Sequence, residues 1–334
     1  SLDRATDCFV KINDNYVYPL MVFAHGVSDW MVDSLDEKVR YFAADRVYEA
    51  GEIHLNSGET LFIEEGAYVK GCVVAEGASD IRICGNGILE GSMYPQMEKP
   101  AINLKDCRNV RIEGLISVDP SFRNLVLNRC TNVEVKDFTG IGTRERRMSD
   151  DGINIIESCD VNIEGAFINA RNNCIALQSN PNVTRPVERI RVRNSVFWKG
   201  DFGMVMEFGY KTDDLIARDV EYSNIDVLHS LSGVFGLSSK SGKASNFRFS
   251  NIRVSDVRHM LFAINQLGEN ASMVNIRFED VTVLDGPICF SDIHAITEDG
   301  IRGISFENLK YGEKKILNPL DAHFRKFKGD VIFK

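Results

Sequence analysis

The sequence predicts an all-β fold, a right-handed parallel β-helix of about ten coils. A short strand-like motif occurs nine times at a nearly constant spacing. A second apolar segment follows it in most repeats, and helical periodicity is nearly absent. A solenoid explains this repetition, because each coil buries its apolar face only by stacking on its neighbours. The rival, a leucine-rich solenoid, lacks its leucine consensus here.

The repeated motif is a polar residue, then apolar, any, apolar, any, and usually Gly, Asn or Asp. Its period of two is that of a short strand, and Gly, Asn and Asp at its edges suit turns. The nine copies begin at Asp80, Asn109, Asn132, Asp160, Arg189, Asp219, Asn246, Asn275 and Gly303. Second strands are expected at residues 123–128, 151–155, 174–178, 203–207 and 260–264.

The repeats divide the chain into three parts. Residues 1–50 are less regular and are expected to supply N-terminal strands and a cap, since an open solenoid end exposes apolar surface and unpaired strand edges. Residues 51–310 are expected to form the β-helix domain. Residues 311–334 are a basic tail without a clear repeat, which either packs on the outside or closes the last coil.

Composition excludes several classes of protein. The chain has 334 residues, 44% of them hydrophobic and 26% charged, which is ordinary for a folded protein. Its net charge of −9 argues against a nucleic-acid partner, which usually needs a basic face. The longest apolar run, Tyr16–Ala24, is too short for a membrane span and contains a proline. None of the eight cysteines forms a CxxC pair, so neither a zinc site nor any other metal site is expected.

Stacking of coils converts sequence offsets into neighbouring positions. Taking Ile153, Ile175 and Met204 as equivalent inward residues predicts two polar columns beside the second strands. Asp151, Asn173 and Phe202 form one column, and Asp150, Asn172 and Asp201 form the other. With rungs ~4.8 Å apart, the first and last residues of the second column would lie about 10 Å apart. Side-chain freedom can bring such a pair to the ~6.5–9.5 Å separation of an inverting glycosidase.

Three stretches resemble those of one enzyme family. The sequence SDDG at Ser149–Gly152 is similar to that family's NTDG, and NNCIA at Asn172–Ala176 is similar to its DDC-apolar-A. The sequence at Ser57–Gly71 is similar to the stretch that opens its helix. The family is glycoside hydrolase family 28, the polygalacturonases, and more loosely family 49, the dextranases and isopullulanases. The resemblance implies a right-handed parallel β-helix that hydrolyses glycosidic bonds with inversion of configuration, using aspartates on consecutive coils. It also favours an extracytoplasmic location.

The chain departs from the family at three places. The family's acid pair is replaced by Asn172 and Asn173, and its GHG is similar only to GDFG at Gly200–Gly203. Its basic RIK, which holds the substrate carboxylate, falls near the apolar Val234–Leu237. An amide has no exchangeable proton of useful pKa, so it cannot be the general acid.

These observations favour a glycoside hydrolase that acts on a poly- or oligosaccharide without a cofactor. Asp201 is the candidate acid by position, and Asp151, on which the resemblance places a family aspartate, or Asp150 is the candidate base. Asx residues also cap turns at β-helix corners, so each aspartate has a structural alternative. A polysaccharide lyase or epimerase, which needs a base and an arginine, and a non-catalytic glycan-binding β-helix remain alternative functions.

Eight further residues are expected to bind substrate: Asn172, Asn173, Asn154, Phe202, Arg144, Arg147, Glu207 and His259. The adjacent asparagines either hydrogen-bond sugar hydroxyls or form a stacked amide ladder. The arginines either hold an anionic sugar by bidentate contacts or neutralise the nearby acids. Glu207 is expected to be a distal subsite residue or a solvated charge rather than the acid. Phe202 is a stacking platform or a packing residue, and His259 is a groove residue or a solvated one.

Overall fold

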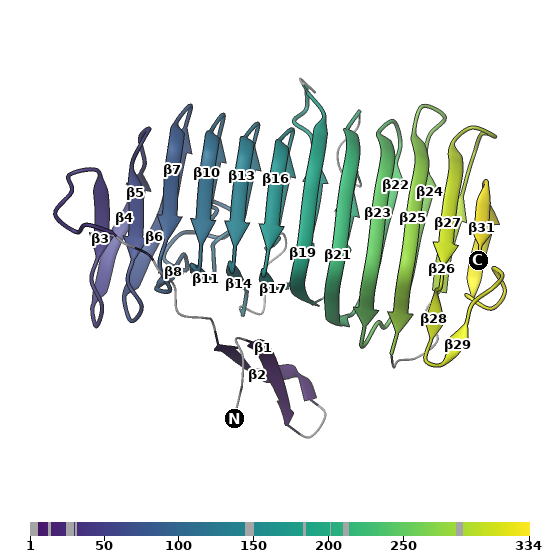
Figure 1. Ribbon diagram of the computed structural model, residues 1–334, viewed down its shortest axis with the longest axis horizontal. Helices are drawn as coiled ribbons and strands as arrows, with labels where there is room; N and C mark the ends of the chain where they lie inside the picture. The colour runs from purple at the N-terminus through teal and green to yellow at the C-terminus, as the bar shows by residue number, and fades with distance from the viewer. Residues whose placement is uncertain are drawn as a thin grey trace.

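The computed structural model describes residues 6–12, 15–24, 30, 32–143, 150–182, 185–200, 202–209, 214–284 and 290–334. Every regular element in these ranges is a β-strand, and parallel strands stack along one axis to form a solenoid (Figure 1). The predicted parallel β-helix is therefore confirmed. Among the described residues, no helix is long and apolar enough to cross a membrane.

Each coil contributes strands to three parallel faces. The first face carries β3 (Val39–Phe42), β5 (Thr60–Ile63), β7 (Ser79–Cys84), β10 (Arg108–Glu113), β13 (Thr131–Lys136), β16 (Cys159–Glu164), β19 (Val187–Lys199), β21 (Ile216–Ser230), β23 (Lys243–Val254), β25 (Ser272–Val283), β27 (Ile301–Glu307) and β31 (Val331–Phe333).

The second face begins with the first halves of β4 (Val47–His54) and β6 (Tyr68–Glu76). It continues through β8 (Ile88–Glu90), β11 (Ile116–Val118), β14 (Thr139–Ile141), β17 (Phe167–Ala170), the second halves of β19, β21, β23 and β25, and β28 (Lys310–Tyr311).

The third face takes the second halves of β4 and β6 and then β9 (Ile102–Lys105), β12 (Leu125–Asn128), β15 (Ile153–Ile156), β18 (Ile175–Gln178), β20 (Met206–Phe208), β22 (Gly233–Ser239), β24 (Met260–Gln266), β26 (Phe290–His294) and β30 (Phe324–Lys328). The second strands expected from the sequence lie on this face. The candidate acidic residues lie where the chain turns from the second face to the third.

The polar residue that opens each repeated motif has a structural cause. The eight non-glycine residues at this position all have φ between 55° and 59°, the left-handed region that Asn and Asp tolerate better than most residues. Their amides also form ladders between coils. Asn132 Nδ2 donates to Asn109 Oδ1 at 2.9 Å, and Asn275 Nδ2 donates to Asn246 Oδ1 at 2.7 Å. The motif therefore encodes both a corner of the coil and a hydrogen bond to its neighbour.

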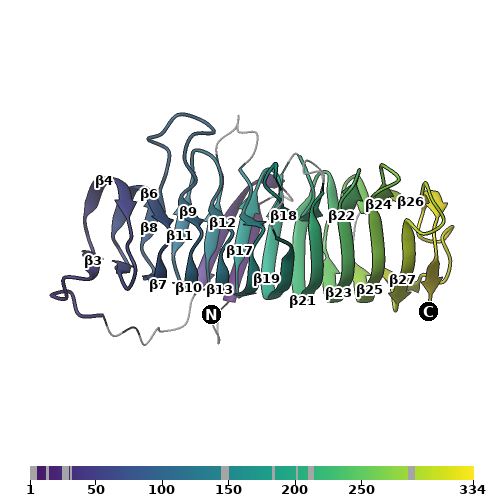
Figure 2. The ribbon, with the colours of Figure 1, turned by 90° about the horizontal axis from the view of Figure 1, so that it is seen from above.

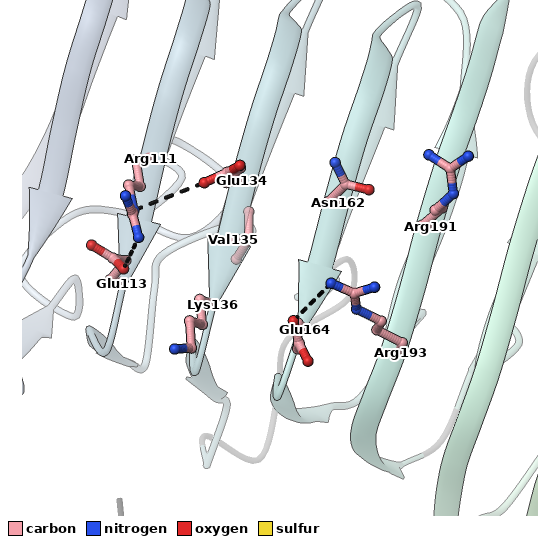
Figure 3. Close-up of a pocket in the computed structure, with 9 residues that line it drawn as sticks. All are labelled: Arg111, Glu113, Glu134, Val135, Lys136, Asn162, Glu164, Arg191 and Arg193. Carbon is pink, nitrogen blue, oxygen red and sulfur yellow. Dashed lines mark hydrogen bonds and ion pairs between the residues drawn. The ribbon is translucent and has the colours of Figure 1, made fainter. Parts of the chain in front are cut away.

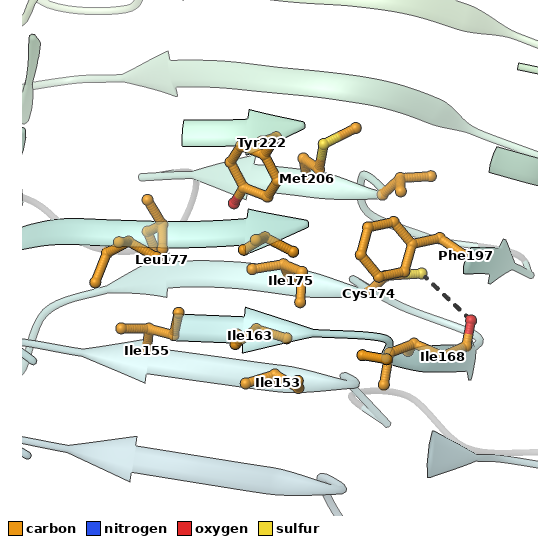
Figure 4. Packing of buried hydrophobic residues seen from close by; sticks show 14 of the residues in the cluster. Ile153, Ile155, Ile163, Ile168, Cys174, Ile175, Leu177, Phe197, Met206 and Tyr222 are labelled. Carbon is orange, nitrogen blue, oxygen red and sulfur yellow. Dashed lines mark hydrogen bonds between the residues drawn. The ribbon is translucent and has the colours of Figure 1, made fainter. Parts of the chain in front are cut away.

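The interior is a stack of apolar columns that fixes the coils against one another. Near the middle of the chain it is aliphatic, with Ile153, Ile175 and Met206 in one column (Figure 4). Toward the C-terminus it becomes aromatic. Tyr222 and Phe249 stack with ring centroids 5.2 Å apart, and Phe249 and Phe278 stack at 4.8 Å.

The two ends differ from the middle. The antiparallel strands β1 (Thr6–Ile12) and β2 (Asn15–Ala24) lie beside the solenoid rather than within it (Figures 1 and 2). Phe23 of this hairpin meets Phe167 of β17 edge to face, with ring centroids 4.8 Å apart. Strands β3 and β4 already pair with β5 and β6, so the solenoid begins before residue 51. At the other end β30 and β31 continue the third and first faces, and β29 (Lys314–Lys315) pairs antiparallel with β28.

Candidate active site

The two motifs that predicted the site lie on adjacent coils, each directly before a strand of the third face. Asp150 and Asp151 precede β15, and Asn172 and Asn173 precede β18. Ile153 of β15 pairs with Ile175 of β18, as the sequence predicted. The motifs are therefore neighbours at the corner between the second and third faces.

The register of the next coil corrects the predicted columns. Ile175 pairs with Met206, not with Met204, so the predicted alignment is wrong by two residues. In this register Gly203 follows Asn172 and Met204 follows Asn173. The sequence had predicted Asp201 and Phe202 at these two places. The apolar residues at both 204 and 206 fit a period-two pattern equally well, and the sequence could not separate these two registers.

Asp151 is buried, and both of its carboxylate oxygens are occupied by the protein. Oδ1 accepts hydrogen bonds from the backbone N–H of Asn173 at 3.1 Å and from its Nδ2 at 3.2 Å. Oδ2 accepts from Asn154 Nδ2 at 2.6 Å and lies 3.6 Å from Arg123 Nε. These hydrogen bonds and the nearby arginine compensate the negative charge of Asp151, and the carboxylate is shielded from solvent.

Asp150 is also buried but is much less well satisfied. Its Oδ1 accepts the backbone N–H of Arg171 at 3.2 Å, whereas its Oδ2 has no hydrogen-bond partner. Burial, followed by the negative charge of Asp151, raises the pKa of Asp150 from 3.8 to about 7. A large fraction of this carboxyl therefore carries a proton near neutral pH, when an ordinary aspartate carries none.

Asn173 links three coils through its side chain. Its Nδ2 donates to Asp151, and its Oδ1 accepts the backbone N–H of Met204 at 2.8 Å. The amide is buried and used within the protein, which favours the structural alternative over a sugar contact. Asn172 is half-buried. Gly203 has φ of 75°, and a Cβ there would lie 2.2 Å from Asn173 Oδ1, so both the turn and the space require glycine.

A buried lysine that the sequence reasoning missed lies at the same corner. Lys199 ends β19, is fully buried, and donates from Nζ to the carbonyl of Gly200 at 3.1 Å and to Ser232 Oγ. Burial lowers its pKa to about 8, against smaller opposite effects of Cys174, Glu207 and the two aspartates. The available signal was a lysine directly after the apolar residues Val196, Phe197 and Trp198, because the end of such a run is often buried, whereas lysine seldom is.

Glu207 is a carboxylate on the coil that follows the two asparagines. It lies on β20, pairs with Ala176 of β18, and is half-buried. Its charge acts on Lys199, as do those of Asp150 and Asp151. Three carboxyl groups from two coils therefore act electrostatically on one buried ammonium group.

A second set of charged side chains lies further along the corner, with His229 and Asp256 buried and Arg258 exposed. His229 Nδ1 lies 2.6 Å from Asp256 Oδ2, and Arg258 Nε lies 2.8 Å from Asp256 Oδ1. The His229 ring packs against Trp198 with centroids 5.1 Å apart, and burial lowers the pKa of His229. Sequence reasoning missed this set, because its members come from three coils and no motif joins them.

Two of the other predicted residues lie on the surface. Phe202 is 58% exposed, and His259 is exposed. Asp201, Arg144 and Arg147 lie outside the described residues. The apolar side chains of Val234–Leu237, near which the sequence analysis placed the lost basic segment, are buried in the core. Within the described part of the chain, no group of three or more His, Cys, Asp or Glu side chains is placed to hold a metal ion.

Comparisons with known proteins identify relatives of this solenoid. The family model described as glycosyl hydrolases family 28 matches residues 68–308. Endopolygalacturonase I of Aspergillus niger is 26% identical over 180 residues, which are 52% of this chain and 44% of that protein. This chain thus spans less than half the length of that curated relative.

Solved structures share the fold at low sequence identity. A polygalacturonase from Erwinia carotovora superimposes with a TM-score of 0.64 at 15% identity, over 86% of each chain. Dex49A from Penicillium minioluteum has a TM-score of 0.64 at 16% identity, over 94% of this chain and 67% of that one. These likenesses support the parallel β-helix architecture.

Proposed function

Since the chain belongs to glycosyl hydrolases family 28, we propose that it hydrolyses glycosidic bonds of a poly- or oligosaccharide. The observation that carries this proposal is Asp150, a buried carboxyl whose pKa is raised to about 7 at the turn before β15. The resemblance of SDDG to the family's NTDG supports the proposal, because it aligns a family aspartate with the neighbouring Asp151. A protonated carboxyl at such a position is the group that glycoside hydrolysis requires as its acid.

In the proposed mechanism Asp150 protonates the leaving glycosidic oxygen. With a pKa of about 7, the carboxyl group is protonated in a large fraction of molecules near neutral pH. It is still acidic enough to donate that proton to the leaving oxygen. Asp151 is held by Asn173, Asn154 and Arg123, so it acts through its charge, which contributes to the high pKa of Asp150. Asp151 is thus proposed as a positioning residue.

The second carboxylate is proposed to come from the coil that carries β20. In single displacement it activates a water molecule on the opposite side of the sugar ring from the acid. Glu207 is half-buried on the outer side of β20 and shares the electrostatic environment of Asp150 through Lys199. Asp201, proposed from the sequence, is the competing residue on the same coil and lies outside the described residues.

The proposed substrate is not polygalacturonic acid itself. The segment at Val234–Leu237, where the family holds a carboxylate, presents backbone and buried apolar side chains here. A glycan with a neutral sugar at the cleavage site fits this segment better, because nothing there would compensate a negative charge.

The alternative function is glycan binding without turnover. It is favoured by the internal saturation of Asp151 and Asn173, which leaves neither side chain free to exchange a proton with a substrate. The two functions differ in whether Asp150 donates a proton during catalysis.

The deciding experiment is a hydrolysis screen over a panel of glycans, read out by newly formed reducing ends. Asp150→Asn, Glu207→Gln and Asp201→Asn are compared with Asp299→Asn, whose carboxylate is exposed in a surface ion pair with Arg302. We expect turnover for the parent and the control, and a loss of about 10²–10⁴ in rate for Asp150→Asn and for one of the other two variants. NMR of the first anomer released tests inversion. Glycan binding without turnover by the parent would instead support the alternative.

A further inference from the structure

A polar hollow lies on the outer side of the first face, away from the corner that holds the aspartates. It has a volume of about 390 Å³ and spans strands β10, β13, β16 and β19 (Figure 3). Its lining residues are Arg111, Glu113, Glu134, Val135, Lys136, Asn162, Glu164, Arg191 and Arg193. This volume is in the range of pockets that hold small ligands.

The hollow arises from one short side chain within a row of long ones. Arg111, Glu134, Asn162 and Arg191 are successive partners in the parallel register and point outward from the sheet. Asn162 is the shortest of the four and stands between Glu134 and Arg191. The longer neighbours therefore form walls, with the amide between them.

The charges in the hollow are only partly paired. Glu113 lies 2.9 Å from Arg111 and 3.3 Å from Arg82, and Glu164 lies 3.0 Å from Arg193. Glu134 lies 3.8 Å from Arg111 Nε. Among the described residues, neither Lys136 nor Arg191 lies within ion-pair distance of a carboxylate, although Arg191 interacts electrostatically with Asp160. Lys136 is in register with Arg193, two rungs away, and Arg191 lies two residues before Arg193 on β19. The backbones of Lys136 and Arg191 are therefore about 12 Å apart.

We propose that this hollow is a second carbohydrate site that binds an acidic sugar, a uronate unit of a glycan. Arg191 can hold the sugar carboxylate by a bidentate contact, with Lys136 as a second cation. Asn162 lies on the strand between these cations, and Glu134 lies two residues before Lys136 on β13. Both can hydrogen-bond hydroxyl groups of the same ring.

The mixture of charges selects this class of ligand. A neutral sugar would gain nothing from the two cations, and a ligand with several phosphate or sulfate groups would offer few hydroxyl groups to Glu134 and Asn162. A uronate uses the cations and the acceptors together. Because the hollow is on the first face and the aspartate corner lies between the second and third, a polymer bound here would be tethered to the protein outside the catalytic corner. This inference does not depend on hydrolysis.

The test measures binding of a purified oligogalacturonate of defined length by calorimetry at low salt. The Asp150→Asn background prevents consumption of the probe. In that background, Arg191→Gln with Lys136→Met removes the unpaired charges, and Asn162→Phe fills the hollow without changing any charge. Arg277→Gln is the matched control, since Arg277 lies further along the same outward row and has only a hydrogen bond to Asn275.

We expect the charge variant and the filled variant each to weaken binding by roughly tenfold or more, and the control to bind as before. A neutral oligosaccharide of equal length should bind at least roughly tenfold more weakly than the oligogalacturonate. Three results would overturn the proposal: no measurable binding of the probe, equal binding of the neutral oligosaccharide, or an equal loss in the Arg277→Gln control. Turnover of a short soluble substrate by the Asn162→Phe variant of the active protein should be unchanged.

Discussion

Replacing Asp150 by asparagine should remove activity and, above neutral pH, stabilise the fold. The reason is that the native site disfavours the carboxylate, whereas the unfolded chain does not. The rise of the pKa from 3.8 to about 7 corresponds to about 4 kcal/mol, at 1.36 kcal/mol for each pH unit. Asparagine keeps a neutral side chain of the same shape, with an oxygen that can still accept the Arg171 N–H.

The sign of the pH dependence follows from proton binding. Between pH 3.8 and about 7 the native protein binds more protons than the unfolded chain, so the free energy of unfolding falls as pH rises through this window. Below pH 3.8 both states are protonated and Asp150 contributes no pH dependence. Above about pH 7 the loss is complete. The Asp150→Asn variant lacks this loss, so its advantage grows from near zero at pH 4 to at most about 4 kcal/mol at pH 8.

Urea unfolding of the parent, Asp150→Asn and Asp299→Asn at several pH values between 4 and 8.5 measures this difference. The exposed Asp299 controls for loss of a surface carboxylate. Parent activity should fall as pH rises through about 7, because the proposed acid loses its proton. Stability curves of the parent and Asp150→Asn that run parallel from pH 4 to 8.5 would refute the reasoning about burial, whatever the effect on rate.

Four further outcomes are expected. Asp151→Asn removes a negative charge that raises the pKa of Asp150, so the high-pH limb of the rate profile should move to lower pH; an unmoved limb would show that the two groups do not interact. Because Met206 rather than Met204 continues the column, Glu207→Gln should reduce turnover by about 10²–10⁴, with kcat affected more than KM, and Asp201→Asn should reduce it much less; the reverse order, measured by steady-state kinetics, would assign the base to Asp201. Polygalacturonic acid should release few reducing ends compared with the best substrate of the panel, and rapid cleavage of it would show that the carboxylate is held elsewhere in the cleft. Phe249→Ala should destabilise the protein by about 3–5 kcal/mol in urea unfolding, since the ring stacks between Tyr222 and Phe278; a loss below about 1 kcal/mol would show that the aromatic column does not hold the coils together.

The sequence determined the fold because the repeat is local. Each copy of the motif supplies two inward apolar residues and a polar residue that accepts a left-handed backbone, and both requirements are met within six residues. The pairing of Ile153 with Ile175 followed from the same local pattern, because the two motifs have equivalent spacing from Asp or Asn to the first inward residue. Asp150 and Asp151 were found for this reason.

The tertiary structure decided what the sequence pattern left degenerate. Met204 and Met206 have the same parity, so only the packed coil selects Met206 as the partner of Ile175 and thereby separates Asp201 and Phe202 from the asparagine columns. Protonation was also beyond the sequence, because the pKa of Asp150 depends on burial by residues from other coils and on the field of Asp151. The same is true of Lys199, whose partner Ser232 lies on the next coil, and of His229 with Asp256. Local patterns specify strands and corners, whereas charge states and contacts between coils arise only when distant residues are brought together in a low-dielectric interior.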